Sequence, residues 1–166
     1  HLYYGTAADT FVEVTTGSIV TDQYTGIGAS WGDYDNDLYP DLFVINRGNS
    51  PQLYKNNGNG TFTKIVSIAY SNSNSRTNSW ADIDNDGDLD VYITGYRTGY
   101  LWRNTGNGFE DVTAQSGIPV QPWGTSAAFA DIDVDGKTDL IIANYVAYNP
   151  DQGTRERCDF RSPNGT

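Results

Sequence analysis

The 166-residue sequence predicts an all-β protein built from tandem four-stranded units, and three observations support this fold class. An acidic cluster recurs at a constant interval of 49 residues, with leading aspartates Asp33, Asp82 and Asp131. Each cluster precedes a short apolar run rich in β-branched and aromatic residues, and no window keeps the 3.6-residue periodicity of a helix. Four short strands in about 50 residues are typical of a propeller blade, which buries its faces only against neighbouring blades.

Each unit continues in the same order after its acidic loop. An apolar strand comes first, at residues 42–45, 91–94 and 140–143. A second turn and two more short strands follow, and the runs 53–56 and 101–104 lead into Asn/Gly-rich turns at 57–60 and 105–108. Phe62 and Phe109 then begin the last strand, so each Asn/Gly-rich turn lies between two strands and predicts a β-hairpin.

An aromatic residue stands two positions ahead of each leading aspartate. These residues are Trp31, Trp80 and Phe129. We interpret them as blade-to-blade packing residues, with stacking on a ligand as the alternative.

The two ends of the pattern fall inside units. Residues 2–14 align with residues 53–65, so the pattern starts in the second half of a unit. The predicted divisions are a half unit at 1–29, units at 30–78 and 79–127, a half unit at 128–145, and an irregular tail at 146–166. About three blade equivalents are fewer than the four to eight that close a propeller. We therefore expect a partial or open propeller whose sheet edges meet further blades of a longer chain or identical copies joined head to tail.

Composition excludes several classes of partner. A net charge of −11, from 21 acidic and 10 basic residues, leaves no basic stripe for nucleic acid. No stretch approaches the roughly 18 consecutive apolar residues of a membrane helix, so we expect no membrane insertion.

The first residue is His1 and no leader follows it, which indicates a mature product or an excised fragment. Cys158 is the single cysteine, so it is either a free thiol or bridges to a partner.

The acidic clusters are predicted metal loops, with carboxylates at positions 1, 3, 5 and 9. A divalent cation would convert their mutual repulsion into coordination, and oxygen ligands without His or Cys favour calcium, up to three ions. A backbone carbonyl at position 7 can add a ligand. The candidate ligands are Asp33, Asp35, Asp37, Tyr39 and Asp41; Asp82, Asp84, Asp86, Asp88 and Asp90; and Asp131, Asp133, Asp135, Lys137 and Asp139.

Position 6 separates the three loops. Gly87 and Gly136 supply the unusual backbone angles of such a turn, whereas the first loop has Leu38, so we expect that loop to be the weakest or most distorted. An EF-hand is excluded because its position 12 requires a bidentate Glu. That position holds Val44, Ile93 and Ile142.

The loop, the apolar strand after it and the aromatic residue before it resemble the FG-GAP repeats of integrin α-subunit propellers and the related VCBS repeats of secreted and bacterial surface proteins. The resemblance covers roughly residues 2 to 145. Residues 101–104 and 108–112, with 129–133 and 140–145, look most like the cartilage-acidic-protein-like group. The resemblance implies a seven- or eight-bladed, calcium-stabilised, extracellular propeller that works in adhesion or ligand binding.

The sequence offers little for catalysis, since the only histidine is His1 and the aspartates are committed to the loops. We predict a calcium-binding module at the cell surface or outside the cell, in which calcium is structural and the protein or glycan ligand is unknown. The alternatives are a protomer that polymerises head to tail through complementary half blades and a carbohydrate-binding propeller fragment. Asn59 and Asn164 lie in Asn-x-Thr sequons, where glycan attachment and chance occurrence are both open. The polar run 71–78 is predicted to be a loop, and Tyr96 and Tyr100 to be exposed contact residues.

Overall fold

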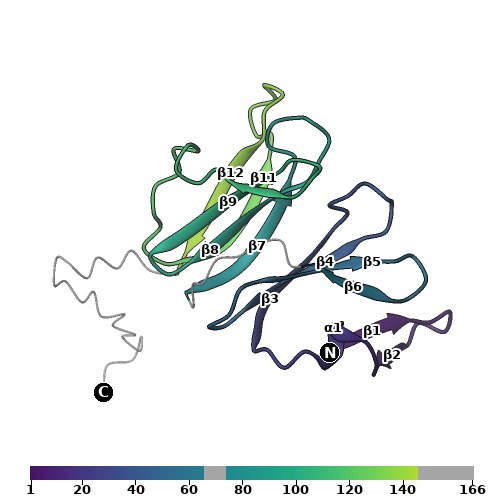
Figure 1. The fold of residues 1–166 in the computed structure, drawn as a ribbon. Helices are drawn as coiled ribbons and strands as arrows, with labels where there is room; N and C mark the ends of the chain where they lie inside the picture. The colour runs from purple at the N-terminus through teal and green to yellow at the C-terminus, as the bar shows by residue number, and fades with distance from the viewer. Residues whose placement is uncertain (66–73, 146–166) are drawn as a thin grey trace, which may run out of the picture.

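A computed structural model describes residues 1–65 and 74–145, and this part of the chain is all-β apart from one four-residue helix. The fold class predicted from the sequence is confirmed, with two four-stranded and two two-stranded sheets that do not close into a ring (Figure 1). The elements are β1 (Leu2–Gly5), β2 (Phe11–Val14), α1 (Ser18–Thr21), β3 (Gly26–Gly32), β4 (Asp41–Asn46), β5 (Gln52–Asn56), β6 (Phe62–Ile65), β7 (Ser75–Ala81), β8 (Asp90–Gly95), β9 (Thr98–Asn104), β10 (Phe109–Asp111), β11 (Gly124–Ala130) and β12 (Asp139–Asn144).

Each sheet is an antiparallel meander of strands consecutive in the chain. The complete blades have the orders β3-β4-β5-β6 and β7-β8-β9-β10, and the smaller sheets pair β1 with β2 and β11 with β12. The register of β1–β2, with Gly5 opposite Phe11, repeats the outer strands of a blade, where Asn56 lies opposite Phe62. The register of β11–β12, with Ala130 opposite Asp139, repeats the inner strands, where Gly32 lies opposite Asp41.

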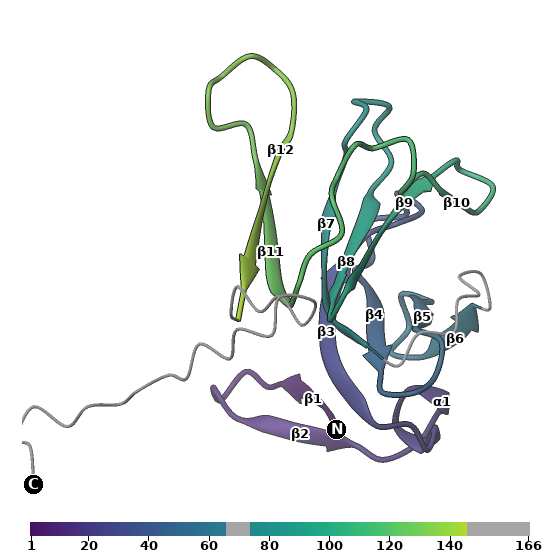
Figure 2. The same ribbon diagram turned by 90° about the vertical axis from the view of Figure 1, so that its left-hand side faces the viewer.

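The first strands of successive units lie beside one another. β7 contacts β3 on one side and β11 on the other, and both views show the β11–β12 hairpin beside β7 (Figures 1 and 2). Glycine permits the approach of β3 to β7, because a Cβ on Gly28 would lie 2.6 Å from the carbonyl oxygen of Arg76. A Cβ on Gly32 would likewise lie 3.0 Å from the ring of Trp80.

The core lies between the two complete blades. Phe43, Ile45 and Leu53 of the first blade are buried against Val91 and Ile93 of the second. Trp80 joins them through an edge-to-face contact with Phe43, with 5.6 Å between ring centroids. This contact confirms the predicted packing role of Trp80. Trp31 is 50% exposed and Phe129 is half-buried, so neither is packed as closely as Trp80.

Two expectations from the sequence are wrong. The end of the polar run 71–78 is strand rather than loop, because Ser75 and Asn78 are buried in β7 beside the neighbouring blades. Tyr96 and Tyr100 are half-buried rather than exposed, since Tyr96 packs against Trp123 and Tyr100 against the core. The tail at 146–166, with Cys158 and Asn164, lies outside the described residues. Over the described ranges, no helix is long and apolar enough to cross a membrane.

Candidate metal centre

The three acidic loops occupy equivalent places in the fold, between the first and second strand of each unit. They connect β3 to β4, β7 to β8 and β11 to β12. In each loop, three carboxylates offer oxygen atoms within 4.8 Å of one another. The clusters are Asp33, Asp35 and Asp37; Asp82, Asp84 and Asp86; and Asp131, Asp133 and Asp139. Each cluster offers three oxygens to one small region, as a divalent cation requires.

The position-1 aspartate turns each loop on itself. Asp82 accepts the backbone N–H groups of Asp86 and Gly87 at 3.1 and 3.0 Å, one on each carboxylate oxygen. Asp33 and Asp131 make the same pair of bonds in their loops, at distances between 2.8 and 3.1 Å. Because each oxygen uses one lone pair in this way, a second remains for a cation.

The position-5 aspartate fastens the following turn. In the second loop, Asp86 Oδ1 accepts the N–H of Asp88 at 2.9 Å, and the other two loops repeat the bond at 2.9 and 2.8 Å. This bond fixes the backbone of position 7, whose carbonyl is the predicted additional ligand. The side chain of Asp88 points away from its own loop, since it accepts a hydrogen bond from Asn36 of the first.

The position-9 aspartate has a different environment from the others. Asp41 and Asp90 are both 0% exposed, and each accepts two backbone N–H groups. Asp90 accepts the N–H of Ile83 at 2.9 Å and that of Asn104, the last residue of β9, at 2.7 Å. Burial raises the pKa of Asp90, and it raises that of Asp41 to about 6. These carboxylates connect loop to blade, and in the first two loops they lie outside the clusters of three.

Backbone strain differs between the loops. Position 6 has positive φ in all three, with Gly87 at 94° and Gly136 at 83°, and Leu38 adopts a φ of 73° as well. The first loop therefore has the same backbone conformation as the other two. The distortion predicted at Leu38 is instead a strained backbone angle at that residue. Position 4 also has positive φ, at 58° and 60° for Asn36 and Asn85, and at 62° for the β-branched Val134. The second loop is the only one of the three without an unfavourable residue at either position.

A basic side chain lies beside each loop. Lys55 of β5 forms ion pairs with Asp35 and Asp37, the latter at 2.7 Å, and its hydrogen bond lowers the pKa of Asp37. Arg103 occupies the same place in β9, but its guanidinium lies 3.8 Å from Asp84 and 2.7 Å from Glu110. Lys137 lies 3.8 Å from Asp135 and is largely exposed. The first loop therefore has the strongest internal counter-charge.

Hydrogen bonds join the loops to one another. The Asn36 amide donates to Asp88 Oδ1 at 2.8 Å and to the Gly87 carbonyl at 3.2 Å, and Asn85 reaches the Gly136 carbonyl at 3.3 Å. The Thr138 hydroxyl donates back to the Asp82 carbonyl at 3.0 Å. Each acidic loop is therefore held directly to the next one along the repeat.

The structure thus brings nine of the twelve predicted carboxylates into clusters, with those at positions 1 and 3 in every cluster. The other three, Asp41, Asp90 and Asp135, lie outside the clusters. Two kinds of residue were missed by sequence reasoning: the amides at position 4 and the Lys–Asn or Arg–Asn pair that ends the third strand. The basic residue–asparagine pair could have been found from the sequence, because Lys55-Asn56 and Arg103-Asn104 recur at matching places in the repeat. Only the structure shows that their side chains and N–H groups meet the loop.

A comparison with protein families matches an FG-GAP-like repeat model to residues 33–93 and again to residues 82–142. Each match starts at the leading aspartate of one acidic loop and runs into the second strand of the next unit. The comparison with curated proteins found no match.

Proposed function

The chain belongs to the FG-GAP-like repeat family, and we propose on that premise that it is a calcium-binding module whose ions are structural. The observation that carries the proposal is the convergence of three carboxylates in each of three loops, within 4.8 Å of one another. Calcium accepts six to eight hard oxygen ligands, and backbone carbonyls and water can complete such a set. FG-GAP-like repeats are generally not catalytic, which supports a binding role for this chain.

Calcium would act here through stability. An ion bound only by the folded form stabilises it by about 2.7 kcal/mol when present at a hundredfold excess over its dissociation constant. Three such sites could supply a large part of the roughly 5–15 kcal/mol that holds a domain together. Each loop joins the first two strands of its unit, so an ion would fix the geometry of the adjoining strands.

A thermal melt in millimolar calcium, repeated with EDTA and with magnesium, tests this proposal. We expect the midpoint to fall strongly with EDTA and to recover more fully with calcium than with magnesium. Asp84→Asn should reduce the calcium-dependent shift, whereas Asp9→Asn removes the same charge outside the loops and should leave the shift intact. An equal midpoint with and without calcium would contradict the proposal.

We further propose a place at the cell surface or outside the cell, and a role in adhesion or ligand binding, as in the cartilage-acidic-protein-like group that residues 101–104, 108–112, 129–133 and 140–145 resemble. Asn59 supports this setting, since it is exposed in the turn between β5 and β6 where a glycan would be accommodated. Secretion from a eukaryotic cell should give a mass that falls on glycosidase treatment. Because Asn164 offers a second sequon, Asn59→Gln and Asn164→Gln should be compared singly and together.

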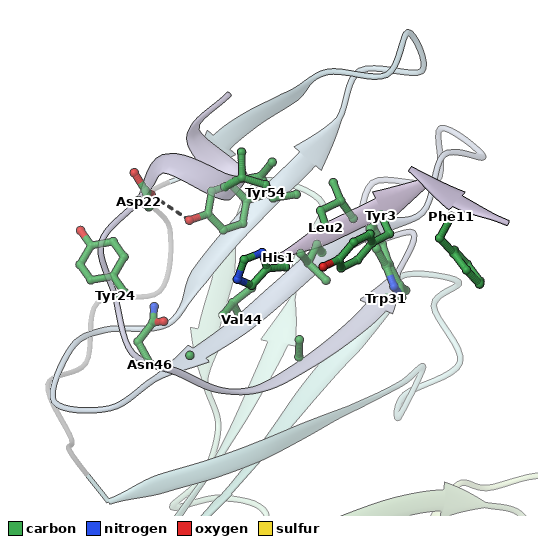
Figure 3. Close-up of a pocket in the computed structure, with 15 residues that line it drawn as sticks. His1, Leu2, Tyr3, Phe11, Asp22, Tyr24, Trp31, Val44, Asn46 and Tyr54 are labelled. Atoms are coloured by element: carbon green, nitrogen blue, oxygen red, sulfur yellow. Dashed lines mark hydrogen bonds between the residues drawn. The ribbon is translucent and has the colours of Figure 1, made fainter. Parts of the chain in front are cut away.

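Carbohydrate binding is the second candidate, and a groove rich in aromatic residues is the observation that favours it. Tyr3, Tyr24, Trp31 and Tyr54 line the groove together with Asp22 and Asn46 (Figure 3). Aromatic faces beside carboxylate and amide groups suit the two faces of a sugar ring. Binding on a glycan array that is lost in Trp31→Ala would support this reading, and no signal from a folded sample would oppose it.

A further inference from the structure

The last hairpin turn of each complete blade contains asparagine followed by glycine. In this dipeptide the backbone nitrogen of the glycine can attack the Cγ of the asparagine side chain, because no Cβ shields that nitrogen, and deamidation follows. The turns lie at 57–60 and 105–108, and the described residues contain three such pairs, which begin at Asn57, Asn59 and Asn107. All three asparagines are exposed, so exposure alone does not distinguish them.

The first pair is restrained at both reacting groups. The Asn57 side-chain amide donates to the Thr61 hydroxyl at 2.8 Å, and its oxygen accepts the Thr63 hydroxyl at 3.0 Å. The nitrogen that would attack, that of Gly58, donates to Asn56 Oδ1 at 3.0 Å. The side chain and the attacking nitrogen are therefore each held by another partner.

The second pair is restrained through its side-chain oxygen. Asn59 Oδ1 accepts the backbone N–H of Thr61 at 3.1 Å and the Thr61 hydroxyl at 2.6 Å. These two bonds hold the side chain toward Thr61 and hinder the rotation that would bring its Cγ to the nitrogen of Gly60. Tyr4 also donates to the Gly60 carbonyl at 2.7 Å, so the β1–β2 hairpin holds the same turn.

The third pair has neither kind of restraint. The Asn107 side chain makes no hydrogen bond with any described residue, and the Gly108 N–H donates to none of them. The turn is closed instead through the Gly108 carbonyl, which accepts the backbone N–H and the hydroxyl of Thr105, both at 2.9 Å. Because Gly108 leads directly into β10, this turn has no counterpart of Thr61.

We propose that Asn107 is a site of spontaneous deamidation in the folded protein and reacts ahead of Asn57 and Asn59. The Gly108 nitrogen loses its proton and bonds to Cγ of Asn107, which closes a succinimide ring. The bond from Cγ to Nδ2 breaks, and Nδ2 leaves as ammonia. Water then opens the ring at either carbonyl, giving aspartate or an isoaspartate whose chain continues through the side chain. The reaction consumes water, releases ammonia and involves no oxidation.

The product changes a turn that lies against the second acidic loop. A Cβ on Gly106, the residue before Asn107, would lie 3.4 Å from Asp88 Oδ2. Both products add a negative charge to this turn at neutral pH. The isoaspartate also lengthens the backbone before Gly108, whose carbonyl accepts both bonds from Thr105, so it displaces the acceptor that closes the hairpin.

Peptide mapping by mass spectrometry, after incubation in mildly alkaline buffer, tests the proposal. The protein should come from bacteria, because a glycan on Asn59 would block that position. We expect the amide of Asn107 to become a carboxyl group several times faster than those of Asn57 and Asn59, and an isoaspartyl methyltransferase to label the same peptide. Mapping separates this signal from Asn164, which lies outside the described residues. Reaction at Asn107 no faster than at the other two would overturn the proposal.

Two controls separate the effect of the fold from that of the dipeptide. In urea-unfolded protein the three pairs should react at comparable rates, because only folding gives them different surroundings. Thr61→Val removes the hydroxyl that restrains Asn57 and Asn59, so it should accelerate reaction at Asn59 and leave the rate at Asn107 unchanged. The same ratio of rates in folded and unfolded protein, or an unchanged rate at Asn59 in Thr61→Val, would show that these hydrogen bonds do not select the site.

Discussion

The side-chain amide of Asn36, in the first acidic loop, lies 2.8 Å from Asp88 Oδ1 in the second. The same amide lies 3.2 Å from the carbonyl of Gly87, so one side chain holds position 6 and position 7 of the neighbouring loop. Asn85 repeats the arrangement toward Gly136 with a single bond of 3.3 Å. Asn also tolerates the positive φ of position 4, so one residue type serves both the turn and the contact. The acidic loops are therefore coupled as well as repeated.

Replacing Asn36 by glycine should weaken this coupling without straining the turn. Glycine keeps the positive φ and removes both hydrogen bonds, and we expect a loss of about 1 kcal/mol in the free energy of unfolding. Asn85→Gly should cost less, because it removes one longer bond. Urea titration measures the two losses, and calcium titration should show shallower binding for Asn36→Gly. Equal effects of the two variants would contradict the assigned difference.

Glycine at position 38 should relieve strain in the first loop. Leu38 has a φ of 73° and is 87% exposed, so its side chain contributes strain and little packing. We expect Leu38→Gly to raise the free energy of unfolding by about 0.5–1 kcal/mol, since relief of strain exceeds the entropy that glycine loses on folding. Calcium affinity at the first loop should rise with it.

Alanine provides the control for the change at position 38. Leu38→Ala keeps the Cβ that causes the strain, so its stability should stay near that of the parent chain. The reverse change, Gly87→Leu, should destabilise the second loop, because position 87 has a φ of 94°, which a leucine adopts only with strain. No atom lies within 4 Å of an added Cβ, so the loss would come from the backbone angle and not from a clash. A gain in stability from Leu38→Ala equal to that from Leu38→Gly would refute the strain argument.

The repeating strands and the aspartate loops were predictable because period, β-propensity and carboxylate spacing are local properties of the sequence. The positive φ at Leu38 was not, because the sequence left two outcomes for a bulky residue there, a different loop or a strained one. The burial of Ser75 and Asn78 was missed for a related reason. Composition predicts a loop, whereas position in the innermost strand gives both polar residues neighbours from other blades.

The difference in role between the clustered aspartates and the buried aspartate at position 9 could not be predicted from the sequence either. Spacing alone assigned Asp90 the same role as Asp82, but Asp90 is fully buried and bonded to two N–H groups from different parts of the blade. Separating these roles requires knowing where Asn104 lies, and that depends on the pairing of β8 with β9. The spacing of the aspartates identified candidate ligands, but it could not show which of these aspartates also accept hydrogen bonds from the blade.

That difference in role predicts opposite responses in EDTA. Asp90→Asn should destabilise the protein by about 2–3 kcal/mol even without calcium, because its amide group would face a backbone donor and leave it unsatisfied. Asp84→Asn removes an exposed charge from an acidic cluster, so without calcium it should be neutral or slightly stabilising. Urea unfolding in EDTA and in calcium separates the two. Equal losses in EDTA would show that the position-9 carboxylate has no structural role of its own.

Lys55 should compete with calcium in the first loop. Its ammonium pairs with Asp35 and Asp37, and these bonds raise the pKa of Lys55, so it stays charged throughout the ordinary pH range. We expect Lys55→Met to lower the stability measured in EDTA and to raise the calcium affinity of the first loop severalfold. Arg103→Met should change the affinity of the second loop less, because its guanidinium lies 3.8 Å from Asp84. Unchanged calcium binding in Lys55→Met would contradict competition.

Asp22 should give the fold an acid-sensitive contact outside the metal loops. Its carboxylate accepts hydrogen bonds from Lys64 at 2.7 Å and from Tyr54 at 2.8 Å, and mainly the Lys64 bond lowers the pKa of Asp22. A carboxyl whose pKa is lower in the folded than in the unfolded state stabilises the fold above its unfolded pKa, near 3.9. That contribution disappears as the pH falls through the lower folded pKa.

In EDTA, where calcium cannot mask the effect, Asp22→Asn should therefore unfold at nearly the same urea concentration as the parent at pH 2. At pH 6 it should unfold at a lower urea concentration than the parent. Urea midpoints across this range measure the difference, and Asp9→Asn serves as a charge-matched control that leaves the Asp22 contact in place. A gap between Asp22→Asn and the parent that stays constant from pH 2 to pH 6 would show that the contact works through shape rather than charge.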